Sequence, residues 1–167
     1  MGAITVGISD LKLAGPPDTL ITYALGSCVG ICLLDPAAKV AGLSHIMLPS
    51  SESSPSDKNV MKFADTAIPD LVRKMEQKGA SRTRMKAKIA GGAQMFGHAN
   101  TGGQSREGDA LWQIGQRNVA AVTAMLQRLS IPILAKDVLA NYGRTVSFDP
   151  ATGVMTVKSL NKTVKEL

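Results

Sequence analysis

The sequence predicts an α+β fold, a sandwich of mixed, largely antiparallel β-sheets with inserted helices. Short apolar runs bounded by turn residues outnumber helical patterns along the 167 residues, which is typical of a domain built mainly from sheet. Asp-Pro pairs follow two of these runs, and proline after Asp favours a tight turn and therefore a hairpin. Because only two segments show helical spacing, the helices are expected to be inserted between strands.

The predicted strands are runs rich in apolar and β-branched residues. They cover residues 4–8, 19–24, 29–34, 40–48, 85–90, 133–138, 144–148 and 154–159. Asp35-Pro36 lies between the third and fourth runs, and Asp149-Pro150 lies between the last two. Each of these pairs of strands is therefore expected to form a hairpin.

Two helices are predicted, over residues 59–77 and 113–129. Ser56 and Asp57 precede the first and are candidate caps, while Pro69 inside it removes a backbone donor and is expected to kink or split the helix. The second carries apolar residues at three- and four-residue steps, which predicts one apolar stripe that packs on a sheet. That stripe consists of Ile114, Ala121, Val122, Met125 and Leu129.

Length and composition predict a single domain over residues 1–167, because a chain of this size can bury one substantial core. Hydrophobic residues make up 44% of the chain, but no run approaches the roughly 20 apolar residues that span a bilayer. The first residues, Met1–Val6, carry no basic region followed by an apolar segment. We therefore expect a cytoplasmic protein without membrane insertion.

The net charge of +6, from 19 basic and 13 acidic residues, favours an acidic partner surface through electrostatic steering. The alternating basic residues Arg82, Arg84, Lys86 and Lys88 are expected to lie on one exposed face of a strand. Six scattered aromatic residues are too few for base-stacking platforms. A nucleic-acid partner is therefore not expected.

The two cysteines, Cys28 and Cys32, are four residues apart. In one extended strand their Cα atoms lie roughly 13 Å apart at about 3.3 Å per residue, which excludes a disulfide between them. No histidine pair follows at zinc-finger spacing. We expect no metal site and no cofactor.

Cys28 begins a predicted strand, and the hairpin returns His45 toward it. The turn pairs residues whose numbers sum to 73 or 74: the first register opposes Cys28 to His45, and the second places them on opposite faces. A thiol needs a neighbouring base to react near neutral pH, and His45 is the candidate. Gly26 allows close backbone approach, so the amides of Ser27 and Cys28 are candidate oxyanion donors.

The alternative for this pair is ordinary packing, since free cysteine and a lone strand histidine are often core residues. Cys32, inside an apolar run, is interpreted as core. His98, in a loop rich in Gly and Asn, is an alternative base. Gly91-Gly92 is interpreted as a tight turn, because the Lys-Ser/Thr of a phosphate loop does not follow it.

Five segments together resemble the CheD family of bacterial chemoreceptor glutamine deamidases. In chain order they are TYALGSCVGICLLDP, GLSHIMLP, AKIAGGAQMF, IGQRN and ANYGRTVSFDPATG, spread between Thr22 and Gly153. The resemblance implies a layered sandwich with helices outside, similar also to the deamidating domain of cytotoxic necrotizing factor toxins. The family's catalytic cysteine, histidine and threonine fall on Cys28, His45 and Thr22.

The resemblance further implies hydrolysis of glutamine side chains in methyl-accepting chemotaxis receptors through a cysteine thioester, with weaker receptor methyl-ester hydrolysis. Gly26 and Ser27 are expected at the oxyanion and substrate site. By their place in the family motif, Gly91, Gly92 and the loop over residues 94–103 are expected to border the substrate groove.

Two other functions remain open from the sequence. Family members resemble partners of CheC-type phosphatases, so the chain is alternatively a docking module and regulator of such an enzyme. A third interpretation is a general cysteine amidase that acts on free glutamine. The complete set of Thr22, Cys28 and His45 favours an enzyme, because a pure adaptor does not need it.

Overall fold

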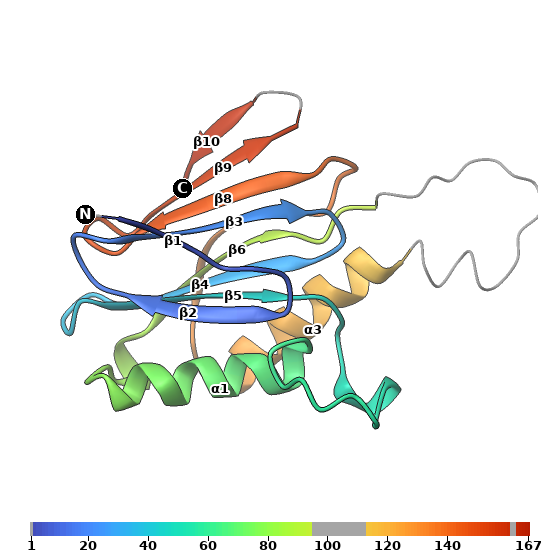
Figure 1. Cartoon of the computed structure of the whole chain (residues 1–167), viewed down its shortest axis with the longest axis horizontal. Coiled ribbons are helices and arrows are strands. Elements are labelled where there is room, and N and C mark those ends of the chain that lie inside the picture. Colours follow the sequence, from blue (N-terminus) through green and yellow to red (C-terminus); the bar gives the residue numbers. More distant parts are fainter. Residues whose placement is uncertain (1, 95–112, 161–162) are drawn as a thin grey trace, which may run out of the picture.

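Two five-stranded sheets lie face to face, and helices cover the far side of one of them (Figure 1). The computed structural model describes residues 2–94, 113–160 and 163–167. Within these residues, all neighbouring strands run antiparallel except β1–β3 and β6–β7, which are parallel. The predicted α+β sandwich of mixed, largely antiparallel sheets is confirmed.

We call the sheet that contacts the helices the inner sheet and the other one the outer sheet. The outer sheet has the order β1 (Ala3–Thr5), β3 (Thr19–Leu25), β8 (Arg144–Asp149), β9 (Val154–Ser159) and β10 (Val164–Glu166). The inner sheet has the order β2 (Asp10–Ala14), β5 (Val40–Ile46), β4 (Val29–Asp35), β6 (Lys86–Gly91) and β7 (Ile133–Val138). The helices are α1 (Ala64–Gln77) and α3 (Ile114–Arg128), with short 3₁₀ turns η1 (Ser51–Ser53) and η2 (Arg82–Arg84).

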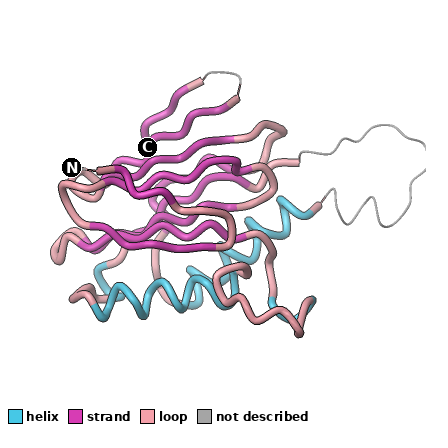
Figure 2. Tube along the Cα trace, in the orientation of Figure 1, coloured by secondary structure: helices cyan, strands magenta, loops and turns pink. Residues whose placement is uncertain are grey.

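The apolar residues form two cores, one on each side of the inner sheet. The first lies between this sheet and the helices and includes Ile31, Ile68 and Val122; the second lies between the sheets and includes Leu20, Leu43 and Val146. Figure 2 shows both helices on the same side of the strands. Because β4 is covered on both faces, its sequence is apolar from Val29 to Leu34, as expected for a central buried strand.

The sequence prediction lacks β2 and β10, which are short, and starts the first helix too early. Asp57 accepts a hydrogen bond from the Asn59 amide, and Asn59 accepts one from the Met61 amide, both at 3.0 Å. These side-chain turns hold the chain out of a helix until Ala64. The helix then continues through Pro69, so the expected split is wrong. None of the described helices is long and apolar enough to cross a bilayer.

The four alternating basic residues do not share one exposed strand face, and that prediction is wrong. Arg82 and Arg84 lie in η2 and only Lys86 and Lys88 in β6. Lys88 Nζ donates to the carbonyl oxygens of Gly153 and Leu167 at 2.7 and 2.8 Å. The Lys88 ammonium group therefore links Leu167, the C-terminal residue, to the inner sheet by a hydrogen bond.

The β4–β5 hairpin has a register that neither sequence alternative contained. Asp35 pairs with Val40 and Gly30 with His45, so paired numbers sum to 75. The turn holds four residues, and its last, Lys39, adopts a left-handed φ of 59° and donates its amide to the Asp35 carbonyl at 2.9 Å. The expected registers, with sums of 73 and 74, required a shorter turn than this one.

Asp35 anchors this turn from a fully buried position. Its carboxylate accepts from the amides of Ala37 and Ser81, at 3.0 and 2.8 Å, and pairs with Arg84 at 2.8 Å. Burial alone opposes ionisation of Asp35, but the hydrogen bonds from Arg84 and from backbone amides outweigh it and lower the pKa to about 2.

Replacing this carboxylate tests its contribution to stability. A group whose pKa is lowered by folding stabilises the fold above its unfolded value, and that stabilisation disappears as the pH falls toward the folded value. We expect Asp35→Asn to lower the free energy of unfolding by about 1–3 kcal/mol at pH 7. The difference from the wild type should vanish between about pH 4 and about pH 2. Urea unfolding across this range measures it.

Asp149→Asn is the matched control, because Asp149 begins the other Asp-Pro hairpin and accepts from the Ala151 amide at 2.9 Å without full burial. It should cause a smaller loss of stability. Equal losses for the two variants, or an Asp35→Asn deficit that persists at pH 2, would contradict the role assigned to Asp35.

Candidate active site

Cys28 lies in the segment that crosses from the outer sheet to the inner one, between β3 and β4. A bulge interrupts the pairing of β3 with β8 between Thr22 and Leu25. Within it, Ala24 takes a left-handed φ of 63° and its carbonyl accepts from the Gly26 amide at 3.1 Å. This bend delivers residues 26–28 to the edge of the space between the sheets, at the end of the sandwich away from the chain termini (Figure 1).

The three carbonyl groups of this segment are all anchored. The Ala93 amide donates to Gly26 at 2.9 Å, and the Gly92 amide donates to Cys28 at 2.8 Å. The side chain of Asn118 donates to Ser27 at 2.9 Å. Among the described residues the amides of Ser27 and Cys28 donate to no other backbone group. The Ser27 amide, and the Cys28 amide that otherwise interacts with its own thiol, are thus candidate donors to a ligand oxygen.

His45 and Thr22 face each other across the space between the sheets, and both are fully buried. Thr22 Oγ1 lies 2.7 Å from His45 Nδ1 and 2.7 Å from the carbonyl oxygen of Val6. A carbonyl only accepts, so the single hydroxyl proton of Thr22 goes to Val6. His45 must therefore donate from Nδ1, which leaves Nε2 unprotonated.

The lone pair of His45 Nε2 is buried and has no hydrogen-bond partner among the described residues. Gly30, directly opposite His45, carries no side chain. Cys28 lies two residues before Gly30 and packs against the core between the sheets, the same side as Thr22 and His45. Cys28 and His45 are therefore diagonal neighbours on one face, a relation that spans roughly 7–8 Å between Cα atoms and is within reach of an imidazole.

Burial favours the neutral forms of the Cys28 thiol and the His45 imidazole. It lowers the pKa of the His45 imidazole from 6.5 to about 4 and raises the pKa of the Cys28 thiol, an effect that the backbone amide of Cys28 partly offsets. The candidate pair therefore consists of a neutral thiol and a neutral imidazole whose Nε2 lone pair has no hydrogen-bond partner among the described residues. Cys32 is fully buried in the core between the sheets, as the sequence predicted.

Gly91 and Gly92 contact the backbone of residues 26–28. Gly91 has a φ of 116°, and a Cβ atom there would overlap the carbonyl oxygen of Cys28. The Gly92 amide is engaged by that same oxygen, and the Gly26 amide by Ala24. These glycines therefore shape the backbone of the site, and the amides of Gly26 and Gly92 are already engaged and are not candidate oxyanion donors. His98 and residues 95–103 of the expected substrate loop lie outside the described residues.

Sequence reasoning missed one residue that contacts the candidate site, Asn118, which is fully buried on α3. It appears in the segment IGQRN, but nothing in the spacing of that segment tells which side chain reaches the strand ends. In the described part of the chain, no three His, Cys, Asp or Glu side chains gather to hold a metal ion.

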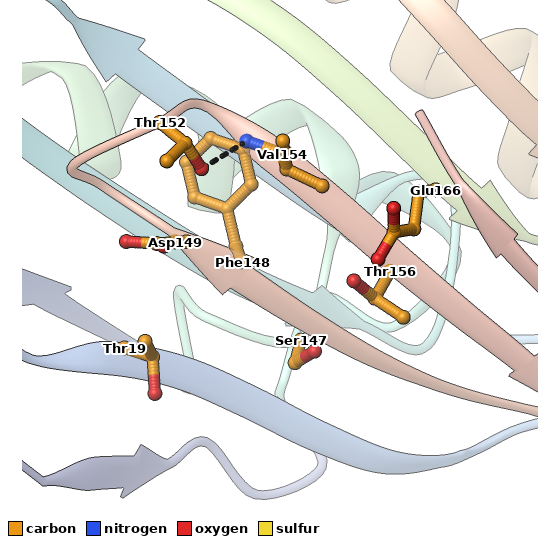
Figure 3. A pocket seen from close by; sticks show the side chains of 8 residues that line it. All are labelled: Thr19, Ser147, Phe148, Asp149, Thr152, Val154, Thr156 and Glu166. Atoms are coloured by element: carbon orange, nitrogen blue, oxygen red, sulfur yellow. Dashed lines mark hydrogen bonds between the residues drawn. The ribbon is translucent and has the colours of Figure 1, made fainter.

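A separate groove of about 290 Å³ lies on the exposed face of the outer sheet (Figure 3). It is lined by hydroxyl groups and two carboxylates, from Thr19, Ser147, Asp149, Thr152, Thr156 and Glu166, together with Phe148 and Val154. Thr152 Oγ1 accepts from the Val154 amide at 3.2 Å. The lining contains neither a cysteine nor a histidine.

Comparison with known proteins places the chain in a family. A family model described as CheD chemotactic sensory transduction matches residues 47–159. Relatives with the name "Probable chemoreceptor glutamine deamidase CheD" match almost the whole chain. The one from Lachnoclostridium phytofermentans is 45% identical over 164 residues, 98% of each chain. Those from Syntrophomonas wolfei and Clostridium botulinum are 49% and 47% identical, over 94% and 98% of this chain and 93% and 97% of their own.

A solved structure shares the fold at very low sequence identity. It is a crystal structure of a Neisseria meningitidis protein of the family DUF152, with a TM-score of 0.51 and 8% identity. The superposition covers 84% of this chain and 64% of the other. This likeness concerns the fold alone.

The tautomer of His45 can be tested directly by ¹⁵N NMR. We expect the wild type to be protonated on Nδ1 and unprotonated on Nε2, and to stay neutral until the pH approaches about 4. Thr22→Val removes the acceptor of the Nδ1 proton and should shift the population toward the other tautomer. Thr22→Ser keeps the hydroxyl and should preserve the wild-type spectrum. A wild-type His45 protonated on Nε2, or an unchanged tautomer in Thr22→Val, would contradict this geometry.

Proposed function

This chain belongs to the CheD family, and from that membership we propose that it hydrolyses glutamine side-chain amides of methyl-accepting chemotaxis receptors to glutamate. The observation that carries the proposal is the 2.7 Å contact between Thr22 and His45, which leaves His45 Nε2 as a free base on the side of Cys28. The names of the relatives support the same activity.

In the first half of the reaction, the Cys28 thiol passes its proton to His45 Nε2 as sulfur attacks the carboxamide carbon. The carbonyl oxygen becomes an oxyanion, which the amides of Ser27 and Cys28 are placed to bind. His45, now an imidazolium, returns the proton to the nitrogen of the substrate. The C–N bond breaks, ammonia leaves, and a thioester joins Cys28 to the receptor side chain.

In the second half, His45 removes a proton from a water molecule that attacks the thioester carbon. A second oxyanion forms at the same two amides and collapses with release of the Cys28 sulfur, which regains its proton from His45. The product is a receptor glutamate. Thr22 acts through His45, because its hydroxyl holds the ring in the tautomer that both halves require. A receptor methyl ester would react by the same steps, with methanol as the leaving group.

Cys28→Ala should abolish the deamidation of a receptor cytoplasmic fragment, because no other described group replaces the attacking sulfur. Mass spectrometry of the fragment measures the conversion and maps the glutamines concerned. Cys32→Ala is the matched control: it removes the other thiol, four residues further along in β4 and fully buried in the core. It should lose stability and keep its activity. Deamidation that survives in Cys28→Ala would overturn the mechanism.

A thioester intermediate should be trapped by hydroxylamine, which competes with water for the acyl group. We expect receptor glutamines to become hydroxamates in a reaction that requires Cys28 and His45. His45→Gln should suppress both hydroxamate and glutamate. If glutamate forms at the wild-type rate while saturating hydroxylamine yields no hydroxamate, water attacks the amide directly and the covalent pathway is wrong.

Two other functions make distinct predictions. A docking role toward a CheC-type phosphatase needs no nucleophile, so Cys28→Ala should retain any such binding, as measured by calorimetry. Hydrolysis of free glutamine, which a small-molecule amidase would show, should be absent in an assay for released ammonia.

A further inference from the structure

Asn118 joins the ends of the two strands that carry the nucleophile and the base. Its Nδ2 lies 2.9 Å from the carbonyl oxygen of Ser27 and 3.0 Å from that of Met47. Ser27 immediately precedes Cys28, and Met47 follows His45 by two residues. Because both contacts are carbonyl oxygens, the amide group of Asn118 must present its NH₂ side to them, and its orientation is determined.

The contact with Ser27 bears directly on the oxyanion donor. The Ser27 carbonyl and the Cys28 N–H belong to one planar peptide group and point in opposite directions. A hydrogen bond to the oxygen therefore sets the direction of the N–H and polarises it, which strengthens its donation to a developing negative charge. The Ala93 amide acts in the same way on the peptide group that carries the Ser27 N–H.

Asn118 is retained at a cost that packing alone does not explain. Its side chain is fully buried, and Oδ1 has no hydrogen-bond partner among the described residues. An apolar side chain of similar size would leave the carbonyl oxygens of Ser27 and Met47 without this donor. The position therefore needs a double donor.

We propose that Asn118 is a positioning residue for deamidation, which holds the Ser27–Cys28 peptide group so that the Cys28 N–H faces the oxyanion. This inference rests on the function proposed above. It predicts that Asn118 lowers the energy of the transition state and contributes little to substrate binding, because the oxyanion exists only during the reaction.

The test uses Asn118→Leu and Asn118→Asp, which keep the size of the side chain and remove its two-proton donor. Loss of one oxyanion donor costs about 10²–10³ in kcat, so misalignment of one should lower kcat by roughly 10- to 100-fold and leave KM within about twofold. Alkylation of Cys28 by iodoacetamide forms no oxyanion. Its rate should stay within about threefold of the wild type, since it reports the thiolate alone.

Val122→Ala is the control for general damage to the helix. Val122 lies one turn further along α3, fully buried in the core against the inner sheet, and contacts neither strand end through a hydrogen bond. This variant should unfold at a lower temperature and keep its kcat. Cys28→Ala, measured beside it, shows whether the proposed function itself holds.

Activity of Cys28→Ala tests the proposed function, and the kinetics of the Asn118 variants test the positioning role. An inactive Cys28→Ala together with a lowered kcat, an unchanged KM and a preserved alkylation rate in the Asn118 variants supports the inference. If Cys28→Ala is active, the proposed function fails. If it is inactive while folded Asn118 variants keep their kcat, change only KM or lose alkylation in parallel, the inference is wrong. Failure of both Asn118 variants to fold would assign the residue a structural role instead.

Discussion

The hydrogen bond between Thr22 and His45 is the contact on which the site depends. The two sheets meet through apolar side chains, which by themselves set no orientation for an imidazole. Thr22 orients the imidazole because its own hydroxyl proton is donated to the Val6 carbonyl, so the hydroxyl oxygen accepts from His45 Nδ1. His45 of β5 therefore donates to Thr22 of β3, and Thr22 donates to Val6, the residue after β1. This chain leaves Nε2 as the one basic nitrogen of His45. A histidine without this partner would exchange between tautomers, and only one of them accepts a proton at Nε2.

Residues 26–28 depend on a second set of contacts, made by the residues that follow β6 and by α3. Gly92 and Ala93 follow β6, and Asn118 comes from α3; together they take up the three carbonyls of residues 26–28. Gly91 permits this approach, since any side chain there would overlap the Cys28 carbonyl. The base is thus oriented by a contact between the sheets, and the candidate oxyanion amides by the residues after β6 and by Asn118 of α3. The proposed reaction would take place at the edge where these two sets of contacts meet.

The sequence predicts the elements better than the contacts between them. Asp35-Pro36 predicted the hairpin, but the register depended on Lys39 adopting a left-handed φ that lengthens the turn to four residues. Periodicity carries no signal for that choice. The Thr22–His45 contact joins two different sheets, so only the family resemblance pointed to it. Asn118 was present in a quoted motif, yet which carbonyls it reaches depends on how α3 packs on the inner sheet.

Burial acts on the pKa of Cys28 and of His45 in directions that both favour the neutral pair. A thiolate and an imidazolium formed in the resting site would each lose hydration, so the proton transfer is unfavourable until charge can be placed elsewhere. A bound carboxamide provides that place, because its oxygen takes the negative charge at the two fixed amides while His45 takes the positive one. The proposed reaction therefore couples ionisation of the thiol to the presence of substrate.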